Sequence, residues 1–275
     1  LRGLILGIEL GIWYSHRLAI NPGGFQRMNT QGLLTIEQLT SLVSAREIET
    51  VVVVFTDLYG RFMGKRFDAE FFLEQIATHG THACDYLVTV DMEMNPVGGY
   101  QFSNWNRGYG DFHLEPDLTT LRIASWLERS AMVLCHVRNE KTHEPVSVAP
   151  RSMLQRQITA ASELGFEAMA GSELEYYVFT QSFRDAAKLR YAEDALEPVG
   201  WYLEDYHILQ GTREEAFHAT VRRHLKNSGI AVECTKGEWG KGQHELNVRY
   251  APVLQMADHQ AIYKQCLKEV ADQLG

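Results

Sequence analysis

Two short stretches of the chain place acidic and amide side chains at a spacing of two residues. Glu173 and Glu175 lie in residues 171–179, where polar and apolar residues alternate as they do along a β-strand. Successive side chains of a strand point to opposite faces, so these two carboxylates are expected on one face, roughly 6.6 Å apart. Glu245 and Asn247 follow the same pattern. We therefore expect two strands, each with one polar face and one core face.

Carboxylates gathered on one face of a sheet repel one another and need a compensating cation. If both strands belong to one sheet, Glu173, Glu175 and Glu245 meet there, with Glu238 in the glycine-broken turn ahead of Glu245. Carboxylate oxygens are hard ligands that suit Mg²⁺ or Mn²⁺. The alternative for each glutamate is an ordinary strand side chain, solvated or paired with a lysine across the sheet. His244 is expected to face away from Glu245, as a supporting or packing residue.

At these residues the sequence resembles the glutamine synthetase family. The pattern G-x-E-x-E-[FY] at Gly171–Tyr176 and the ending G-Q-H-E-L-N at Gly242–Asn247 have the order and spacing typical of that family. The ending is most similar to the type I-like branch, which includes glutamate–amine ligases. The resemblance extends from about Met28 to the last residue.

The resemblance implies a set of site residues. Glu175, Glu238 and Glu245 correspond to ligands of a first Mg²⁺ or Mn²⁺ ion. Glu173 corresponds to a ligand of a second ion, which touches the phosphates of ATP, and Glu233 to a residue that contacts the nucleotide. In the implied reaction ATP phosphorylates the side-chain carboxylate of glutamate, and ammonia or a small amine then displaces phosphate to give a γ-amide. Divalent ions neutralise and orient the anions that must meet.

The long loop at 91–117 gives information about the acceptor, the ammonia or amine that would displace phosphate. One interpretation is a structured surface loop anchored by its aromatic residues. The resemblance instead implies a loop that reaches the active site of a neighbouring subunit, where Asp91 corresponds to an aspartate that helps bind and deprotonate ammonium. Small polar residues follow that aspartate in the family, whereas Met92–Met94 follow it here. This departure favours an organic amine as acceptor. A glutamate–ammonia ligase and a non-catalytic relative with an interaction role stay open as alternatives.

Periodicity predicts an α+β fold with two main parts. Residues 28–143 combine short hairpin strands with two helices, and the resemblance implies a small β-grasp-like N-terminal domain. Residues 144–275 follow a proline-containing boundary, and the resemblance implies part of a glutamine synthetase catalytic domain, a curved antiparallel sheet with helices. Residues 1–27 are expected to be a non-native or unstructured extension ahead of a natural start at Met28.

Local signals predict particular elements within these parts. Thr35 with Gln38, and Thr212 with Glu215, have the spacing of capping boxes, and Asp68 can cap a further helix. Strands are expected in the β-rich stretches of the first part, at 51–56, 61–67, 86–90, 119–123 and 131–137.

Composition limits the partners. A net charge of −9 without a basic run argues against nucleic acid. The apolar run at 3–12 is too short to span a bilayer, and Glu9 within it argues against a signal peptide. The 4 scattered cysteines are typical of reduced thiols in a cytoplasmic protein. The resemblance implies a full-length homo-oligomeric ring with active sites shared between subunits. Family members continue with further ligands and arginines, so we expect these residues to be a fragment that is inactive alone.

Overall fold

The computed structural model describes residues 12–16 and 31–275, and contacts divide the chain into two compact units. The N-terminal unit extends to Glu167 and includes Asn227–Gly229, and the C-terminal unit contains Ala168–Lys226 and Ile230–Gly275. A domain boundary at residue 144 stays a prediction. The prediction of an extension at 1–27 falls largely outside the described residues. Within it, Ile12–His16 form strand β1, which pairs at the edge of the C-terminal sheet.

The N-terminal unit is built on a mixed sheet of 6 strands in the order β3-β2-β7-β5-β4, with β6 paired to β7. Its strands are β2 (Thr50–Thr56), β3 (Phe62–Asp68), β4 (Thr81–Cys84), β5 (Asp111–Pro116), β6 (Arg122–Ile123) and β7 (Ser130–Asn139). The pair β2 and β7 is parallel, whereas the other pairs are antiparallel. The α+β class is therefore confirmed. The mixed sheet alone does not establish the β-grasp-like arrangement.

Strand β2 lies between β3 and β7, and all but its two end residues are buried. The run Val51–Phe55 is buried throughout, as expected of a strand with neighbours on both edges and both faces covered. Helix α1 (Ile36–Ser44) adds Leu39 and Val43 to the same core. Phe55 contacts Phe112 of β5 edge to face, with ring centroids 5.1 Å apart. The core thus extends across the sheet from β2 to β5.

Two predicted helix starts in this unit are confirmed. The Thr35 hydroxyl accepts from the Gln38 N–H at 3.2 Å, and the Gln38 side chain accepts from the Thr35 N–H at 2.8 Å. Asp68 caps the helical segment formed by α2 (Ala69–Phe71), the π-helical η1 (Phe72–Ile76) and α3 (Ala77–His79). Gly80 follows with a φ of 67°, a left-handed conformation that ends the helix.

Three local predictions were wrong at least in part. The stretch 86–90 is not a strand: η2 (Asp85–Val88) is a 3₁₀ turn, held where the Asp85 carboxylate accepts from Ser103 and from the Gly110 N–H. The stretch 119–123 contains the 3₁₀ turn η3 (Leu118–Thr120) ahead of the short β6. Thr212 lies inside helix α6 (Ile208–Arg213), where its hydroxyl donates to the Ile208 carbonyl at 2.9 Å instead of capping the next helix.

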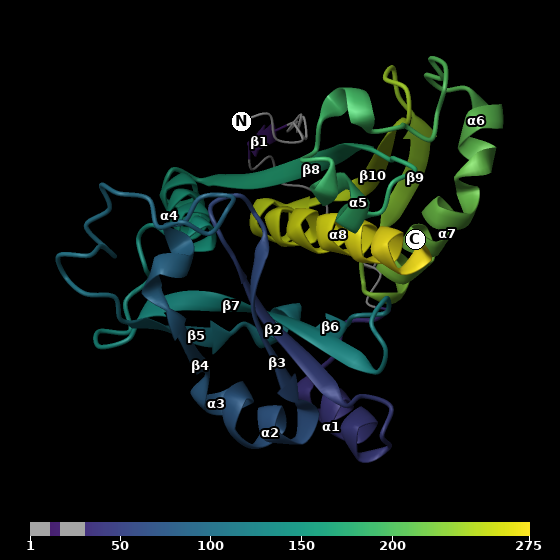
Figure 1. Cartoon of the computed structure of the whole chain (residues 1–275). Helices are drawn as coiled ribbons and strands as arrows, with labels where there is room; N and C mark the ends of the chain where they lie inside the picture. Colours follow the sequence, from purple (N-terminus) through teal and green to yellow (C-terminus); the bar gives the residue numbers. More distant parts are fainter. Residues whose placement is uncertain (1–11, 17–30) are drawn as a thin grey trace. The chain divides into compact units, whose positions relative to one another are not determined.

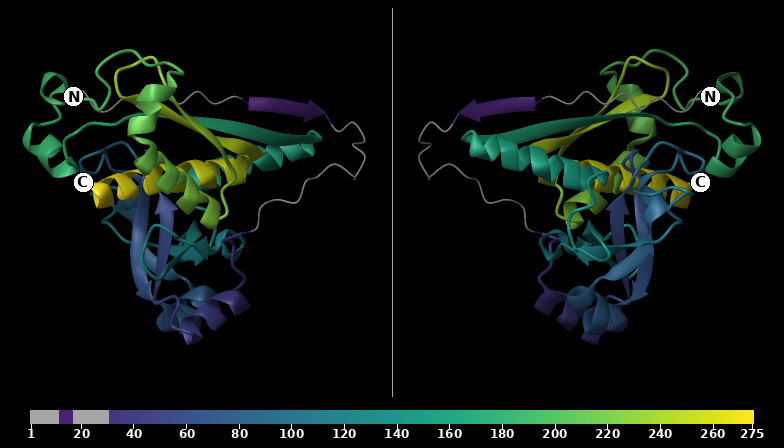
Figure 2. Two further views of the ribbon diagram at one scale, coloured as in Figure 1. Left: turned by 90° about the vertical axis from the view of Figure 1, so that its right-hand side faces the viewer. Right: turned by 90° about the vertical axis from the view of Figure 1, so that its left-hand side faces the viewer.

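The C-terminal unit contains a sheet of 4 strands in the order β1-β8-β10-β9, and the pairs of β10 with β8 and with β9 are antiparallel (Figure 1). Its other elements are β8 (Phe166–Tyr177), α5 (Phe183–Lys188), η4 (Glu193–Ala195), α6, α7 (Glu215–Asn227), β9 (Val232–Gly237), β10 (Gln243–Pro252) and α8 (Val253–Leu274). Helices α7 and α8 lie on the same side of the sheet (Figure 2). In the described part of the chain no helix combines the length and apolar character needed to cross a membrane.

Helices α7 and α8 cover the face of β8 and β10 that carries the apolar side chains. Leu174 and Leu246 are paired across the two strands and fully buried. Ser172 of β8 hydrogen-bonds Tyr263 of α8 at 2.7 Å, and His218 of α7 contacts the ring of His244. Because side chains alternate along a strand, the residues between these positions point to the opposite face.

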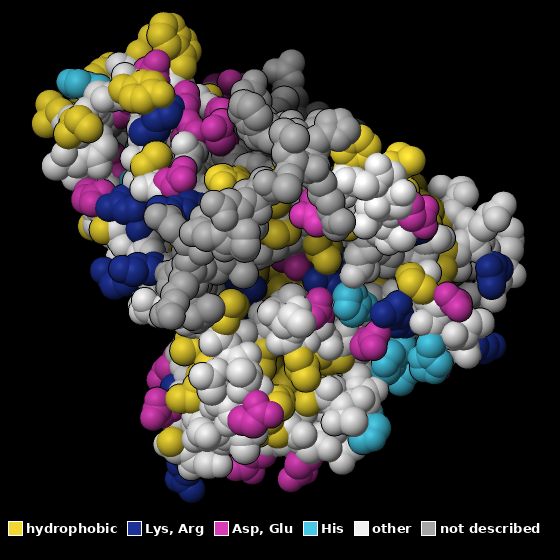
Figure 3. Space-filling view, turned by 180° about the vertical axis from the view of Figure 1, so that it is seen from behind, with side chains coloured by type: hydrophobic (Ala, Val, Ile, Leu, Met, Phe, Trp, Pro, Cys, Tyr) yellow, Lys and Arg dark blue, Asp and Glu magenta, His cyan; other side chains and the backbone are white. Residues whose placement is uncertain are grey.

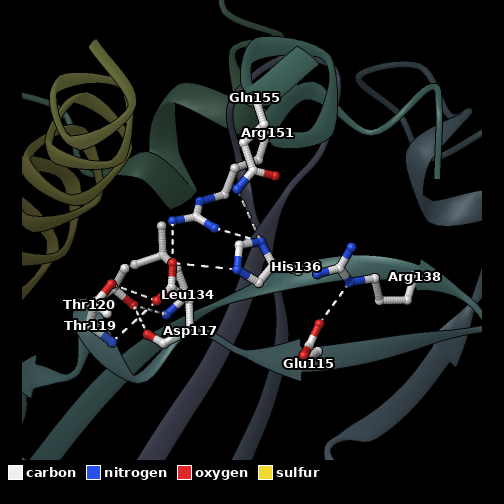
Figure 4. A network of polar contacts seen from close by, with 9 residues as sticks. All are labelled: Glu115, Asp117, Thr119, Thr120, Leu134, His136, Arg138, Arg151 and Gln155. Atoms are coloured by element: carbon white, nitrogen blue, oxygen red, sulfur yellow. Dashed lines mark hydrogen bonds and ion pairs between the residues drawn. The ribbon is translucent and has the colours of Figure 1, made fainter. Parts of the chain in front are cut away.

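Helix α4 (Pro150–Glu163) is held to the N-terminal sheet by a partly buried charged network (Figure 4). Arg151 of α4 donates to the Asp117 carboxylate at 2.7 Å and to Nδ1 of His136 at 2.8 Å. Burial disfavours the ionised form of Asp117, but hydrogen bonds from Thr119 and Arg151 lower its pKa below the ordinary value. Burial and the neighbouring Arg151 lower the pKa of His136, so that Nδ1 remains free to accept.

The network yields a prediction with an internal control. We expect Asp117→Asn to lower the free energy of unfolding by about 1–3 kcal/mol, because Arg151 loses its counter-charge in a partly buried position. Glu115 pairs with Arg138 on the same sheet at 2.7 Å, but this pair is more exposed. Glu115→Gln should therefore cost less than about 1 kcal/mol. Urea unfolding of both variants at pH 7.5 measures the difference, and equal losses would contradict the anchoring role of Asp117.

Candidate functional site

The register of the C-terminal sheet places the acidic residues of the two motifs on one face. Glu245 of β10 lies opposite Glu175 of β8, and Asn247 lies opposite Glu173. On the other edge of β10, Lys236 of β9 lies opposite Glu245, and Cys234 lies opposite Asn247. The resulting polar face contains two rows across three strands: Glu175, Glu245, Lys236 and Glu173, Asn247, Cys234.

The turn between β9 and β10 positions Glu238 beside this face. The Glu238 N–H donates to the Gln243 carbonyl at 2.9 Å, and the Gln243 N–H donates to the Gly240 carbonyl at 3.0 Å. Gly242 adopts a φ of 72°, and a Cβ there would lie 2.9 Å from the Val178 carbonyl oxygen. A side chain at that position would therefore strain the turn and displace its contact with the chain after β8.

Gln243 ties the turn to β8 through both ends of its amide. The side-chain oxygen accepts from the Gly240 N–H at 2.8 Å and from the Tyr177 hydroxyl at 3.1 Å. The side-chain nitrogen donates to the Glu175 carboxylate at 2.6 Å. Gln243 thus fixes the orientation of Glu175 and the shape of the turn that carries Glu238.

The ammonium group of Lys236 lies between two of the carboxylates. It pairs with Glu238 and lies 2.8 Å from the Glu245 carboxylate, and it also lies over the Tyr206 ring, 4.4 Å from the centroid. Partial burial alone would lower the pKa of Lys236, but its hydrogen bonds to Glu238 and Glu245 outweigh burial and raise it. Lys236 is therefore charged and neutralises part of the acidic cluster.

The side chains of Glu238 and Glu245 are hydrogen-bonded to each other, and both contact Lys236. Burial raises the pKa of Glu245, and the contact with Glu238 raises it further. Burial also works against the ionised form of Glu238, but hydrogen bonds with Glu245 and Lys236 lower its pKa. The two carboxyl groups therefore compete for one positive charge, and a stronger cation at this place would ionise both.

Glu173 and Glu233 are less constrained than the other glutamates. Glu173 is exposed on the polar face. Glu233 is exposed where the pairing of β9 with β10 shifts, because Val232 lies opposite Val248 whereas Cys234 lies opposite Asn247. This extra residue is a β-bulge, which turns Glu233 away from the regular ladder. The nucleotide contact predicted for Glu233 is untested by this arrangement.

Asp91 lies in the N-terminal unit, in a turn that its own side chain stabilises. The carboxylate accepts from the Glu93 N–H at 2.9 Å and the Asn95 N–H at 2.8 Å. The hydrogen bond from the Asn95 backbone is the main cause of a lowered pKa of Asp91. Arg61 donates hydrogen bonds to the backbone carbonyls of Asp91 and Met92, and these bonds stabilise the turn. Asp91 is therefore an ionised, partly exposed group.

Aromatic contacts order the loop that follows Asp91. Tyr109 packs edge to face against Tyr86 and against Trp105, with centroid distances of 5.8 and 4.9 Å. Trp105 itself remains 80% exposed, and Met92 and Met94 are also exposed. The loop is thus a structured surface loop with apolar side chains directed to solvent, a composition typical of contact surfaces.

Exposed aromatic residues also accompany the polar face. Tyr206 contacts Lys236, and Trp239 follows Glu238 directly. Elsewhere in the same unit, the guanidinium carbon of Arg213 lies 3.8 Å from the ring centroid of Trp201. All three rings are largely exposed. Figure 3 shows hydrophobic side chains gathered at the surface of the molecule. Exposed apolar side chains of this size beside a charged cluster are typical of a ligand or partner site.

The opposite face of the sheet is a buried aromatic cluster. His244 packs there with Tyr176 of β8 and His218 of α7, and the two histidine rings lie 4.5 Å apart. The orientation predicted for His244 is therefore confirmed. Burial lowers the pKa of His218 to about 3 and that of His244 to about 4. In the described part of the chain Nε2 of each ring has no hydrogen-bond partner.

The donor set of the polar face fits a hard divalent cation in its chemistry. Glu238 and Glu245 contact one positive charge, the Lys236 ammonium, and Glu175 lies opposite Glu245 in the ladder. The buried side-chain oxygen of Asn247 has no partner among the described residues. Within 12–16 and 31–275, however, no group of three or more His, Cys, Asp or Glu side chains is arranged so that it could already hold a metal ion. The metal-binding role of Glu173, Glu175, Glu238 and Glu245 therefore stays a prediction.

Sequence reasoning missed Lys236 and Gln243. Lys236 lies two residues before Glu238, and a lysine paired across a sheet was the ordinary alternative for these glutamates. A spacing of two on a strand could therefore have indicated it. Gln243 is part of the motif, but its bridging role depends on Tyr177 and Gly240, which only the folded turn brings together.

Comparisons with known proteins agree with the motifs. Residues 147–275 match the family model "Glutamine synthetase, catalytic domain". Gamma-glutamylethanolamide synthetase GlnA4 of Streptomyces coelicolor is 42% identical over 88% of this chain. The chain belongs to the glutamine synthetase family. The family member glutamate–isopropylamine ligase of a Pseudomonas species is 30% identical over 90% of the chain, and the glutamine synthetase of Thermotoga maritima is 24% identical over 86%.

The chain spans about half the length of these relatives, 52% of GlnA4 and 53% of the isopropylamine ligase. Among solved structures, the "GmaS/ADP complex" matches 86% of this chain and 50% of its own, with a TM-score of 0.68 and 23% identity. This likeness supports the same fold for the two chains. It also agrees with an α+β chain whose second part belongs to the glutamine synthetase catalytic domain.

The buried cluster predicts a pH dependence of stability. Because the folded pKa of His218 lies below the ordinary value of about 6.5, the unfolded chain binds the proton more tightly. The free energy of unfolding should fall by roughly 1 kcal/mol per pH unit as the pH drops from about 6.5 to 5. In His218→Phe this slope should be shallower, with little loss at pH 7.5 because Nε2 makes no hydrogen bond.

Urea unfolding at several pH values measures this slope. A variant of an exposed histidine, His79→Gln, controls for the change in titratable groups. An unchanged slope in His218→Phe, or a stability that rises on acidification, would contradict the role of the buried ring.

Proposed function

We propose that the protein carrying this chain is an ATP-dependent ligase that joins the side-chain carboxylate of glutamate to a small amine. The observation that carries the proposal is the pairing of Glu175 with Glu245 on one sheet face, together with Glu238, which shares the Lys236 ammonium with Glu245. Membership of the glutamine synthetase family and the names of two relatives, an ethanolamide synthetase and an isopropylamine ligase, support it.

In this proposal Glu175, Glu238 and Glu245 would hold a first Mg²⁺ or Mn²⁺ ion, Glu173 a second, and Glu233 would contact the nucleotide. When bound, the divalent ions would neutralise the charge of glutamate and of the ATP phosphates, which otherwise repel each other. The chain's own residues prepare the site. Gln243 orients Glu175, and the glycine turn presents Glu238 next to the buried Glu245.

The acceptor we propose is an organic amine. Asp91 would help bind it, since an ionised carboxylate attracts an ammonium group and a lowered pKa makes it a weak base. Exposed Met92 and Met94 follow Asp91 in place of small polar residues, and apolar side chains suit the carbon substituent of an amine. Ammonia is the second candidate for the acceptor, because Asp91 corresponds to the aspartate that helps bind ammonium in the family.

The finer features of the family belong to the same proposal. The N-terminal unit would correspond to the family's β-grasp-like domain, and its loop after Asp91 would contribute to the active site of a neighbouring subunit. The full-length protein would then be a cytoplasmic homo-oligomeric ring.

An acceptor assay tests the proposed activity. Phosphate release that depends on both ATP and glutamate should be measured for the full-length protein, with ammonium, ethanolamine, isopropylamine and a polyamine as acceptors. We expect the highest kcat/KM with an organic amine. We also expect Glu245→Gln to lower kcat by roughly 10²–10³, as for loss of one preorganised electrostatic contact.

Met92→Ser with Met94→Ser serves as the matched test of the acceptor. The double variant should lose discrimination between isopropylamine and ammonium while it keeps its KM for ATP. A kcat/KM highest for ammonium in the unchanged protein would contradict the proposed acceptor, and an absence of phosphate release with every acceptor would contradict the ligase itself.

A further inference from the structure

Lys236 is the only lysine or arginine that the described ion pairs place on Glu238 or Glu245. Its backbone is fixed, because Lys236 lies opposite Glu245 in the ladder of β9 and β10. Its side chain is 18% exposed, and its head group contacts one carboxylate on the turn, one on β10 and the ring of Tyr206. Three contacts from three segments make this a defined position for a cation.

The position coincides with the place of the proposed metal. Glu238 and Glu245 are two of the three ligands assigned to the first ion, and Lys236 already occupies the space between them. A single ammonium cannot satisfy both carboxyl groups and Glu175, whose carboxylate accepts from Gln243 instead. A divalent ion offers twice the charge and can take oxygen ligands from all three. Ammonium and metal therefore exclude each other at this place.

We propose that Lys236 is a built-in counter-ion that holds the acidic cluster together without metal and is displaced when a divalent cation binds. This inference rests on the proposed metal site and adds a residue that tunes it. The lysine stem is flexible, so the head group can leave while the strand stays paired. Because every binding event must break the lysine pairs, Lys236 weakens the affinity for metal and prevents repulsion among the carboxylates before metal arrives.

Metal binding to the whole chain tests the proposal without any activity assay. Lys236→Met removes the charge and keeps most of the side-chain volume. We expect it to bind Mn²⁺ about tenfold tighter than the unchanged chain in an electron paramagnetic resonance titration, since the lysine pairs no longer compete. In EDTA the variant should have a lower Tm than the unchanged chain, and saturating Mn²⁺ should remove this difference.

Lys188→Met is the matched control in the same unit. Lys188 of α5 pairs with Asp185 at 2.6 Å in an exposed position, apart from the assigned ligands. Its loss should change neither Mn²⁺ affinity nor the response of the Tm to Mn²⁺. Lys236→Arg, which keeps the charge, should bind Mn²⁺ no more tightly than the unchanged chain.

A second measurement follows the lysine itself. Acetylation by an N-hydroxysuccinimide ester, read by mass spectrometry, should modify Lys236 slowly in EDTA and several-fold faster in Mn²⁺, while the rate at Lys188 stays constant. Mn²⁺ binding that is lost in Glu245→Gln but unchanged in Lys236→Met would overturn this inference and leave the proposed metal site intact. Absence of Mn²⁺ binding in both the unchanged chain and Lys236→Met would overturn the metal site and this inference together.

Discussion

Like charge on one face of the C-terminal sheet is the constraint on which the site depends. Pairing β8 with β10 brings Glu175 directly opposite Glu245, and the turn adds Glu238. Carboxylates in such positions raise one another's pKa unless a cation lies among them. Burial and the contact with Glu238 raise the pKa of Glu245, and the ammonium of Lys236 offsets part of the repulsion. A cation is therefore needed to offset the electrostatic repulsion among these carboxylates.

The same pairing determines the rest of the C-terminal unit. Alternation sends Leu174, Tyr176, His244 and Leu246 to the face covered by α7 and α8. A shift of one residue in register would bury the carboxylates under the helices and expose the leucines. The apolar packing thus fixes the register, and the register fixes which polar side chains meet. Core packing and the chemistry of the polar face are consequences of one arrangement.

The sequence could predict features that depend on local periodicity. The shared face of Glu173 and Glu175, the outward turn of Glu245 away from His244, and the capping box at Thr35 all follow from spacings of one to three residues. Family motifs added the assignment of the catalytic domain, which the match at 147–275 confirms. These features need no knowledge of what lies across the sheet.

Features that depend on distant partners could not be predicted. Residues 86–90 have strand composition, yet Asp85 finds Ser103 and Gly110 and forms a turn instead. Thr212 has the spacing of a cap, but α6 begins earlier and uses its hydroxyl inside the helix. The spacing of Lys236 from Glu238 is visible in the sequence, but its contact with Glu245 depends on the register in which β9 pairs with β10. Contacts across the fold decided the first and last of these cases, and the start of α6 decided the case of Thr212.

The central claim is that the polar face binds a divalent cation through Glu175, Glu238 and Glu245. Anomalous diffraction at the manganese edge, from crystals of the chain soaked in Mn²⁺, tests it most directly. The account predicts one strong peak among these three carboxylates, with the Lys236 head group moved away from Glu238 and Glu245. An anomalous peak only at sites away from these three carboxylates, with Lys236 still between Glu238 and Glu245, would contradict it.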